Sequence, residues 1–181
     1  MPKHHKQHAP SDGFLNSVRL QFFDQVKYLA VLMHASLKDD DDVQRQGKSL
    51  YCATNKLRGT FDQCSTAVKN TLFRAYCMPM HACQLWSKYT RTSMKRLRAA
   101  YNNAYRTMHY IPRNVSVRSH QVNHCVKSFD ILIEKQSVSV FKRGVSSSNF
   151  SLRSLQMSDD FYKSSFFLNY LTLLYDDEQL Q

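Results

Sequence analysis

Apolar positions recur along much of this chain at spacings of three and four residues, which is the period of amphipathic helices. The clearest case lies over residues 92–109, where one stripe is apolar and a neighbouring stripe is basic. The apolar stripe consists of Met94, Leu97, Tyr101, Ala104, Tyr105 and Met108. The pattern predicts a helix that turns this stripe toward a core.

The same spacing predicts three further helices. One begins at the acidic run 39–42, where carboxylates favour the positive end of a helix dipole, and ends at Gly59. A second runs over residues 65–76 with Ser65 as its N-cap, and a third over residues 122–140. The second helix is expected to turn Val68, Leu72 and Phe73 inward.

Residues 15–37 contain short apolar runs rich in β-branched and aromatic side chains. Such runs are typical of strands, and they predict one or two here, the second over residues 26–33, with the first pairing to it as a hairpin. The predicted fold class is therefore mainly α with a short N-terminal β hairpin (α+β).

Composition divides the chain into four segments. We expect a disordered leader (1–13), a β hairpin (14–37), a helical region (38–143), and a tail (144–181) that is first Ser-rich and then aromatic and acidic. The longest apolar candidate, residues 166–174, is well short of the about 18 residues of a membrane span. Five scattered Cys and no secretory signal favour a reducing, intracellular location, in the nucleus or cytoplasm.

Charge changes this picture most over residues 43–118, where fourteen Lys and Arg face one acidic residue, Asp62. A surface with so large an excess of positive charge favours binding of a polyanion, most often nucleic acid. Aromatic residues accompany the charge, and exposed rings can stack on bases, although Tyr101 and Tyr105 are expected in the core. The accompanying aromatics are Trp86, Tyr89, Tyr101, Tyr105 and Tyr110.

Several short segments follow one another in an order known from one enzyme family. They include Gln25-Val26-Lys27-Tyr28-Leu29, Ser49-Leu50-Tyr51, Phe73-Arg74-Ala75-Tyr76-Cys77, Gln84-Leu85-Trp86 and Leu97-Arg98-Ala99-Ala100-Tyr101-Asn102-Asn103-Ala104. This order resembles the region just after the catalytic motifs of reverse transcriptases from non-LTR (LINE-type) retrotransposons, over about residues 14–143. Ala30 stands where the family's Lys-Tyr-Leu-Gly strand has Gly.

The resemblance implies that residues 14–37 are the palm edge and that the following helices form a thumb that grips template and primer. The family's catalytic aspartates lie upstream on palm strands that this chain lacks, so no catalytic residue carries over. The chain alone is expected to be inactive and to hold no cofactor, with Mg²⁺ expected only for the complete polymerase. The expected partners are RNA and DNA, bound by their backbones, and the missing palm.

Resemblance and charge together predict a set of nucleic-acid-binding residues: Lys27, Arg45, Lys48, Lys88, Arg91, Lys95, Arg98 and Arg106. The predicted function is thus that of a C-terminal polymerase fragment gripping an RNA/DNA duplex. One alternative is a recruited remnant that serves as a protein-interaction or chromatin-associated module without catalysis. Another is a fragment with no stable fold of its own.

Three other groups invite a chemical interpretation. Carboxylates 39–42 suggest a two-metal site, but adjacent side chains diverge, so we expect them to cap the helix and balance charge. Residues 175–178 resemble the aromatic-x-Asp-Asp motif but have Glu178 in the fourth position, and we expect a frayed acidic end. Cys77, His81 and Cys83 lack a fourth zinc ligand, and core Cys are expected. No metal site is predicted.

Overall fold

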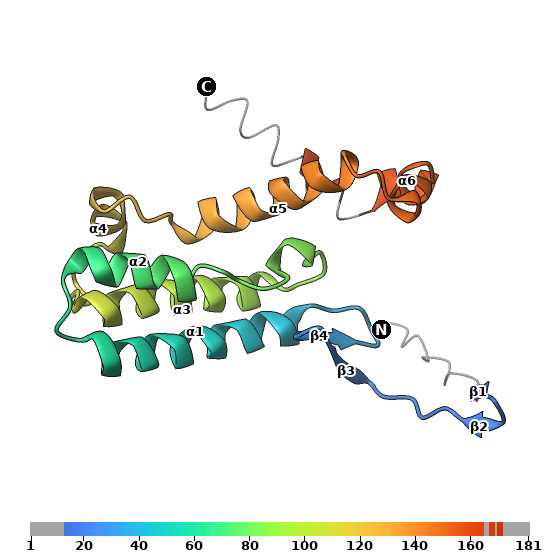
Figure 1. The fold of residues 1–181 in the computed structure, drawn as a ribbon, viewed down its shortest axis with the longest axis horizontal. Helices are drawn as coiled ribbons and strands as arrows, with labels where there is room; N and C mark the ends of the chain where they lie inside the picture. The colour runs from blue at the N-terminus through green and yellow to red at the C-terminus, as the bar shows by residue number, and fades with distance from the viewer. Residues whose placement is uncertain (1–12, 165–166, 169, 172–181) are drawn as a thin grey trace, which may run out of the picture.

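The computed structural model describes residues 13–164, 167–168 and 170–171. Within these ranges the chain is mainly helical and begins with two small antiparallel hairpins (Figure 1). The prediction of a mainly α fold with a β start is confirmed at this level. Almost all of the predicted leader and the whole of segment 175–178 lie outside the described residues.

The N-terminal arm, residues 13–37, holds both hairpins. Strand β1 (Phe14–Leu15) pairs with β2 (Val18–Arg19), and β3 (Gln25–Tyr28) pairs with β4 (Val31–His34). The prediction of one strand over residues 26–33 is wrong, because Leu29 and Ala30 reverse the chain at φ values of 45° and 65°. Neither residue is a usual choice for such a turn, so the sequence carried no turn signal.

Seven α-helices and one 3₁₀ helix follow in the described part of the chain. They are α1 (Asp40–Phe61), α2 (Thr66–Tyr76), η1 (Cys83–Leu85), α3 (Arg91–His109), α4 (Val117–Asn123), α5 (Phe129–Val145), α6 (Phe150–Gln156) and α7 (Asp159–Lys163). Helices α1 and α3 are parallel, since Asp40 bonds to Ser93 in their first turns, and Arg58 in the last turn of α1 bonds to Tyr110, the C-cap of α3. Helices α2 and α5 run in the opposite direction (Figure 1).

Helix boundaries match the prediction at α2, at α3 and at the start of α1, which falls at Asp40 within the acidic run. The Ser65 hydroxyl accepts a hydrogen bond from the Val68 amide at 3.5 Å, which confirms the predicted N-cap of α2. Helix α1 continues through Gly59 to Phe61, because Gly59 does not adopt the left-handed conformation of a C-terminal cap. Val68, predicted to face inward, is 43% exposed.

The predicted helix over residues 122–140 is instead two helices, α4 and α5. The chain breaks between them at Cys125, which has a φ of 53°. The Arg74 guanidinium donates to the backbone oxygens of His124 and Cys125 at 2.8 and 3.2 Å, and so supplies donors to the carbonyls that follow α4. A helical periodicity on both sides of the break concealed it from sequence reasoning.

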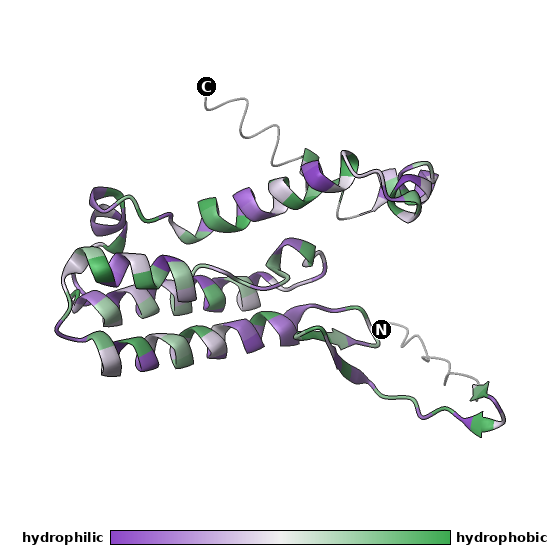
Figure 2. Ribbon diagram, viewed as in Figure 1, coloured by the Kyte–Doolittle hydropathy of each residue, from purple (hydrophilic) through white to green (hydrophobic). Residues whose placement is uncertain are grey.

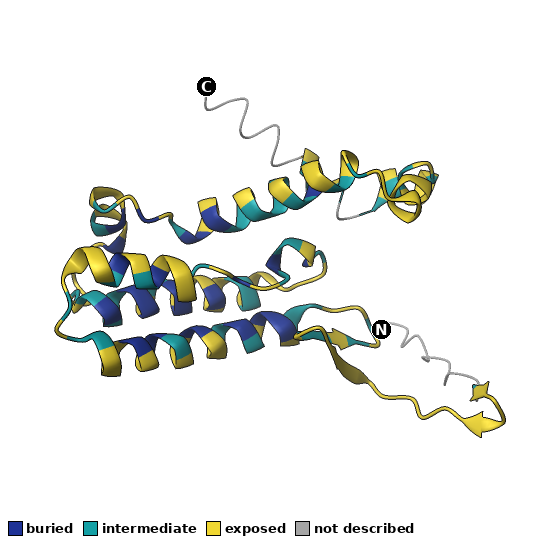
Figure 3. Cartoon of the chain, in the orientation of Figure 1, coloured by how far each residue is buried: buried dark blue, intermediate teal, exposed yellow. Residues whose placement is uncertain are grey.

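The core lies along the seam of α1 and α3, and α2, α4 and α5 pack around it (Figure 3). The rings of Tyr101 and Tyr105 each meet Phe73 of α2 edge-on, with centroids 5.4 and 5.1 Å apart. The predicted apolar stripe of α3 is therefore confirmed, although Met94 is only partly buried. Both tyrosines are core residues, as expected.

The two ends of the described chain contribute little to this core. Strand β1 is hydrophobic in Figure 2, yet β1 and β2 are both exposed in Figure 3, and α6 and α7 contain no buried residue. Helix α5 crosses the composition boundary at residue 143 and ends at Val145. Beyond it, Phe161 packs on Phe141 of α5, with ring centroids 6.3 Å apart.

Candidate nucleic-acid interface

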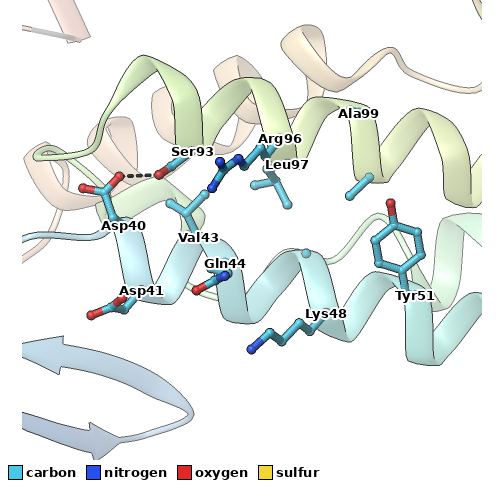
Figure 4. Close-up of a pocket in the computed structure, with 12 residues that line it drawn as sticks. Asp40, Asp41, Val43, Gln44, Lys48, Tyr51, Ser93, Arg96, Leu97 and Ala99 are labelled. Carbon is cyan, nitrogen blue, oxygen red and sulfur yellow. Dashed lines mark hydrogen bonds between the residues drawn. The ribbon is translucent and has the colours of Figure 1, made fainter.

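A groove of about 560 Å³ runs between α1 and α3 (Figure 4). Its floor is made of small and apolar residues, among them Gly47 and Ala100, where the two helices approach each other. Lys48 stands on the α1 wall and Arg96 on the α3 wall, and Tyr51 closes one end. The groove therefore places one cation on each side of a shallow apolar channel.

The acidic run 39–42 lies at the start of α1, at the end of the groove away from Tyr51. Its carboxylates diverge, as expected. Asp39 Oδ2 accepts hydrogen bonds from the amides of Ser87 and Lys88 at 2.8 and 2.7 Å. Asp39 is the N-cap residue of α1, but its side chain makes no hydrogen bond to the first amides of that helix, so the prediction that its carboxylate caps α1 is wrong. Its carboxylate instead orders the loop that leads into α3.

Asp40 belongs to α1 but supports the first turn of α3. Its Oδ1 accepts from the amide and the hydroxyl of Thr90, the N-cap of α3, at 3.0 and 2.8 Å, and from the Ser93 hydroxyl. The hydrogen bond from Ser93 is the main reason that the pKa of Asp40 is lowered. Because α3 has no acidic residue in its own first turn, Asp40 supplies the negative charge that this dipole end favours.

Asp42 is buried, with 1% of its surface exposed, and joins three separate segments. Its carboxylate accepts from the Leu32 amide at 2.9 Å, from Trp86 Nε1 at 2.9 Å and from Arg45 Nε at 2.6 Å. Burial raises the pKa of Asp42, but the three donors outweigh it and hold the pKa below its usual value. The run 39–42 is thus a structural junction of the arm, α1 and α3.

This junction removes two residues from the predicted interface. Trp86 is 6% exposed and its indole donates to Asp42, so it is not available to stack on a base, contrary to expectation. Arg45 is held in the ion pair with Asp42. Among the other aromatics of the basic segment, Tyr89 and Tyr110 are exposed by 39% and 51%.

The eight predicted binding residues fall into two groups. Three make internal contacts: Arg45 with Asp42, Arg98 with Asp130 of α5, and Arg106 with the Pro112 carbonyl oxygen. The other five have exposed side chains with no partner among the described residues: Lys27, Lys48, Lys88, Arg91 and Lys95. Lys27 lies on β3 in the arm, apart from the helical set.

Sequence reasoning missed Arg96, which is also exposed and unpaired within the described ranges. It lies off the stripe of Arg91, Lys95 and Arg98 and faces α1 across the groove. Arg96 could be chosen only once α1 and α3 were known to be parallel neighbours. No sequence motif indicates that arrangement. We call Lys48, Lys88, Arg91, Lys95 and Arg96 the cationic face.

The cysteines singled out as possible zinc ligands are core residues, as expected. Cys77 and Cys83 are 1% and 2% exposed, and burial raises the pKa of both thiols, that of Cys83 to about 12. The Cys83 thiol donates to Gln136 Oε1 at 2.6 Å. Within the described residues, no group of three or more His, Cys, Asp or Glu is arranged to hold a metal ion.

Three histidines cluster where α3 meets α4. The His109 and His120 rings lie 5.3 Å apart and the His120 and His124 rings 4.5 Å apart, while the Tyr105 hydroxyl lies 2.9 Å from His120 Nδ1. Burial, followed by the two neighbouring histidines, lowers the pKa of His109 to about 4. The cluster packs α4 onto the core.

Comparison with models of protein families, with curated proteins and with solved structures finds no match for this chain. No helix in the part of the chain that the structure describes is long and apolar enough to cross a membrane.

Proposed function

We propose that this chain binds nucleic acid through the phosphate backbone, using the cationic face. The observation that carries the proposal is the difference between the two charge types at this end of the helices. The five cations are exposed and unpaired among the described residues, whereas Asp39, Asp40 and Asp42 accept hydrogen bonds from inside the fold; of the run 39–42, Asp41 alone is exposed, and it accepts from Gln25. The positive charge is therefore free to meet a ligand.

The spacing of the cations suits a phosphate chain. Arg91 and Lys95 are four residues apart on α3, about 6 Å along the helix axis, while Arg96 and Lys48 line the α1–α3 groove, which neither Arg91 nor Lys95 lines. Contacts of this kind position a nucleic acid without reading its sequence. With five phosphate contacts, affinity is expected to fall about 500-fold between 50 and 200 mM salt.

The first experiment measures binding of a labelled RNA/DNA hybrid by fluorescence anisotropy over that salt range. The variant Lys48→Glu/Lys95→Glu/Arg96→Glu removes three cations of the face, none of which has an internal partner in the described structure. The control Lys56→Glu/Arg153→Glu/Lys163→Glu makes the same change in net charge at exposed sites elsewhere. Loss of binding in the first variant only would support the proposal, and equal binding by both would refute it.

We further propose, from the sequence resemblance, that the helical region derives from the thumb of a non-LTR retrotransposon reverse transcriptase. On this proposal the preferred ligand is an RNA/DNA duplex, which the helical region holds by its backbone. Competition by duplex DNA and by duplex RNA tests the preference. A tenfold advantage for the hybrid would support the lineage, and equal affinity for all three duplexes would count against a template-primer grip.

A second candidate function is docking of a protein, and the observation that favours it is the arm. Its large apolar side chains are exposed, among them Phe14, Phe22 and Phe23 at 64%, 56% and 64%. Apolar surface of this extent normally marks an interaction site. On the polymerase proposal its partner is the palm of the parent enzyme. The variant Phe22→Ser/Phe23→Ser should raise solubility and leave nucleic-acid binding unchanged; lower solubility would contradict a docking role.

A further inference from the structure

A second groove lies on the side of α3 away from α1, between α5 and the loop over residues 79–84. It has a volume of about 490 Å³. Helix α3 contacts both α1 and α5, and α1 and α5 form opposite edges of the helical region in Figure 1. This groove is therefore separate from the α1–α3 groove, with which it shares no lining residue.

The walls of the second groove carry positive charge only. Lys127, Lys135 and Arg143 line it together with His81, and no carboxylate does. All four side chains are exposed. The nearby Asp130 of α5 is outside the lining and is paired with Arg98. None of these cations belongs to the predicted interface. Lys127, Lys135 and Arg143 lie beyond residues 43–118, the most basic segment of the sequence.

The groove is a built part of the fold and not a gap between mobile side chains. Gln136 on α5 accepts from the Cys83 thiol at 2.6 Å and donates to the Met78 carbonyl oxygen at 3.4 Å, so it holds both ends of the loop. Met80 and Leu132, 2% and 4% exposed, form an apolar floor. The cations are thus presented at fixed positions around that floor.

The spacing along α5 identifies the kind of anion that fits. Lys135, Ser139 and Arg143 follow at intervals of four residues, so they share one face of the helix and line the groove together. Lys135 and Arg143 are about 12 Å apart along the axis, which corresponds to three or four phosphates of one strand when α5 lies along the duplex axis, where each phosphate advances about 3.4 Å. A single phosphate group cannot span them, whereas an extended phosphodiester chain does.

The side chain of Arg143 is also held in part by a hydrogen bond within α5. Its Nε donates to the Ser139 carbonyl oxygen at 3.3 Å, which lays the guanidinium along the helix. Its two Nη groups have no partner among the described residues, and neither do the ammonium groups of Lys127 and Lys135. The donors that a phosphate needs are therefore unoccupied.

We infer that this groove is a second nucleic-acid-binding site, which takes the phosphodiester backbone of a segment distant from the one on the cationic face. The inference rests on the proposed function for the identity of the polyanion. Two sites on one chain bind a sufficiently long nucleic acid together, and the second contact is then intramolecular. Affinity is expected to rise with the length of the nucleic acid beyond what the cationic face alone gives.

The test uses the full chain and a labelled duplex of about 30 base pairs, with anisotropy measured from 50 to 200 mM salt. The variant Lys135→Glu/Arg143→Glu removes two cations of the second groove. The control Lys142→Glu/Arg153→Glu has the same net charge, with one change adjacent to Arg143 but outside the lining. Circular dichroism of both variants checks that the helices are retained.

We expect the second-groove variant to bind at least tenfold more weakly than the control and to reduce the slope of log affinity against log salt by about two. Binding equal to that of the control would overturn the second site. The cationic-face variant, Lys48→Glu/Lys95→Glu/Arg96→Glu, separates this failure from that of the proposed function. If it alone loses binding, only the second site is wrong; if the second-groove variant alone does, the cationic face is wrong; if neither does, both are.

Discussion

Replacing Asp42 by alanine should weaken the fold at the point where the arm, α1 and the loop before α3 meet. Asp42 is 1% exposed and accepts hydrogen bonds from Leu32, Trp86 and Arg45. The substitution leaves the Leu32 amide and the Trp86 indole N–H without their acceptor. Arg45 is 24% exposed and can turn to water, so the loss of its ion pair with Asp42 costs less.

The magnitude follows from these three donors. A hydrogen bond to a charged acceptor contributes about 1.5 kcal/mol or more, so the Leu32 and Trp86 bonds together account for about 3 kcal/mol. Against a total stability of about 5–15 kcal/mol for a domain, that is a large fraction. The matched control is Asp41→Ala, since Asp41 is exposed and accepts only from Gln25 Nε2 at 3.2 Å, and it should cost less than about 0.5 kcal/mol.

Urea unfolding provides the assay, because Trp86 is the sole tryptophan of the chain and its indole contacts Asp42 directly. Circular dichroism follows the helices while Trp86 fluorescence follows the junction. In Asp42→Ala the native emission should shift to longer wavelength as water reaches the indole, and the midpoint should fall. A loss below about 1 kcal/mol with unchanged emission would refute the assignment of Asp42 as the junction.

The remaining predictions concern backbone and protonation. Gly47→Ala and Gly59→Ala should each raise stability by up to about 1 kcal/mol, or Tm by about 2–4 °C, because both positions are helical and an added Cβ meets at most ordinary contacts; lower Tm values would contradict this. Ala30→Gly should slow hydrogen exchange of the β3–β4 amides about fivefold, since Ala30 has a φ of 65°; faster exchange would exclude backbone strain there. Between pH 7 and 4.5 the wild type should lose about 2 kcal/mol more than His109→Gln, a figure reduced for partial exposure of the ring. The pKa of His109 is about 4 when folded and 6.5 when unfolded, so the unfolded chain takes up the proton first; equal losses by both proteins would show that His109 does not titrate in this way.

Local patterns in the sequence were sufficient to predict a helix where its apolar residues repeat on one face, or where a side chain caps its first turn. Helix α3 was predicted because Leu97, Tyr101 and Ala104 repeat on one face, and the start of α2 because the Ser65 hydroxyl reaches an amide three residues ahead. The stripe of basic residues on α3 was also correct as a pattern of charge.

Tertiary structure alone decided which of those charges are free. Arg98 belongs to the basic stripe but pairs with Asp130, 32 residues later, while Arg96 lies off the stripe and faces Lys48 of α1. Likewise the acidic run became a junction because Trp86 and Leu32 came to it from either side in the fold. The physical reason is that the partner of an exposed charge is selected by distance in space, and a one-dimensional charge pattern contains no information about which helices are neighbours.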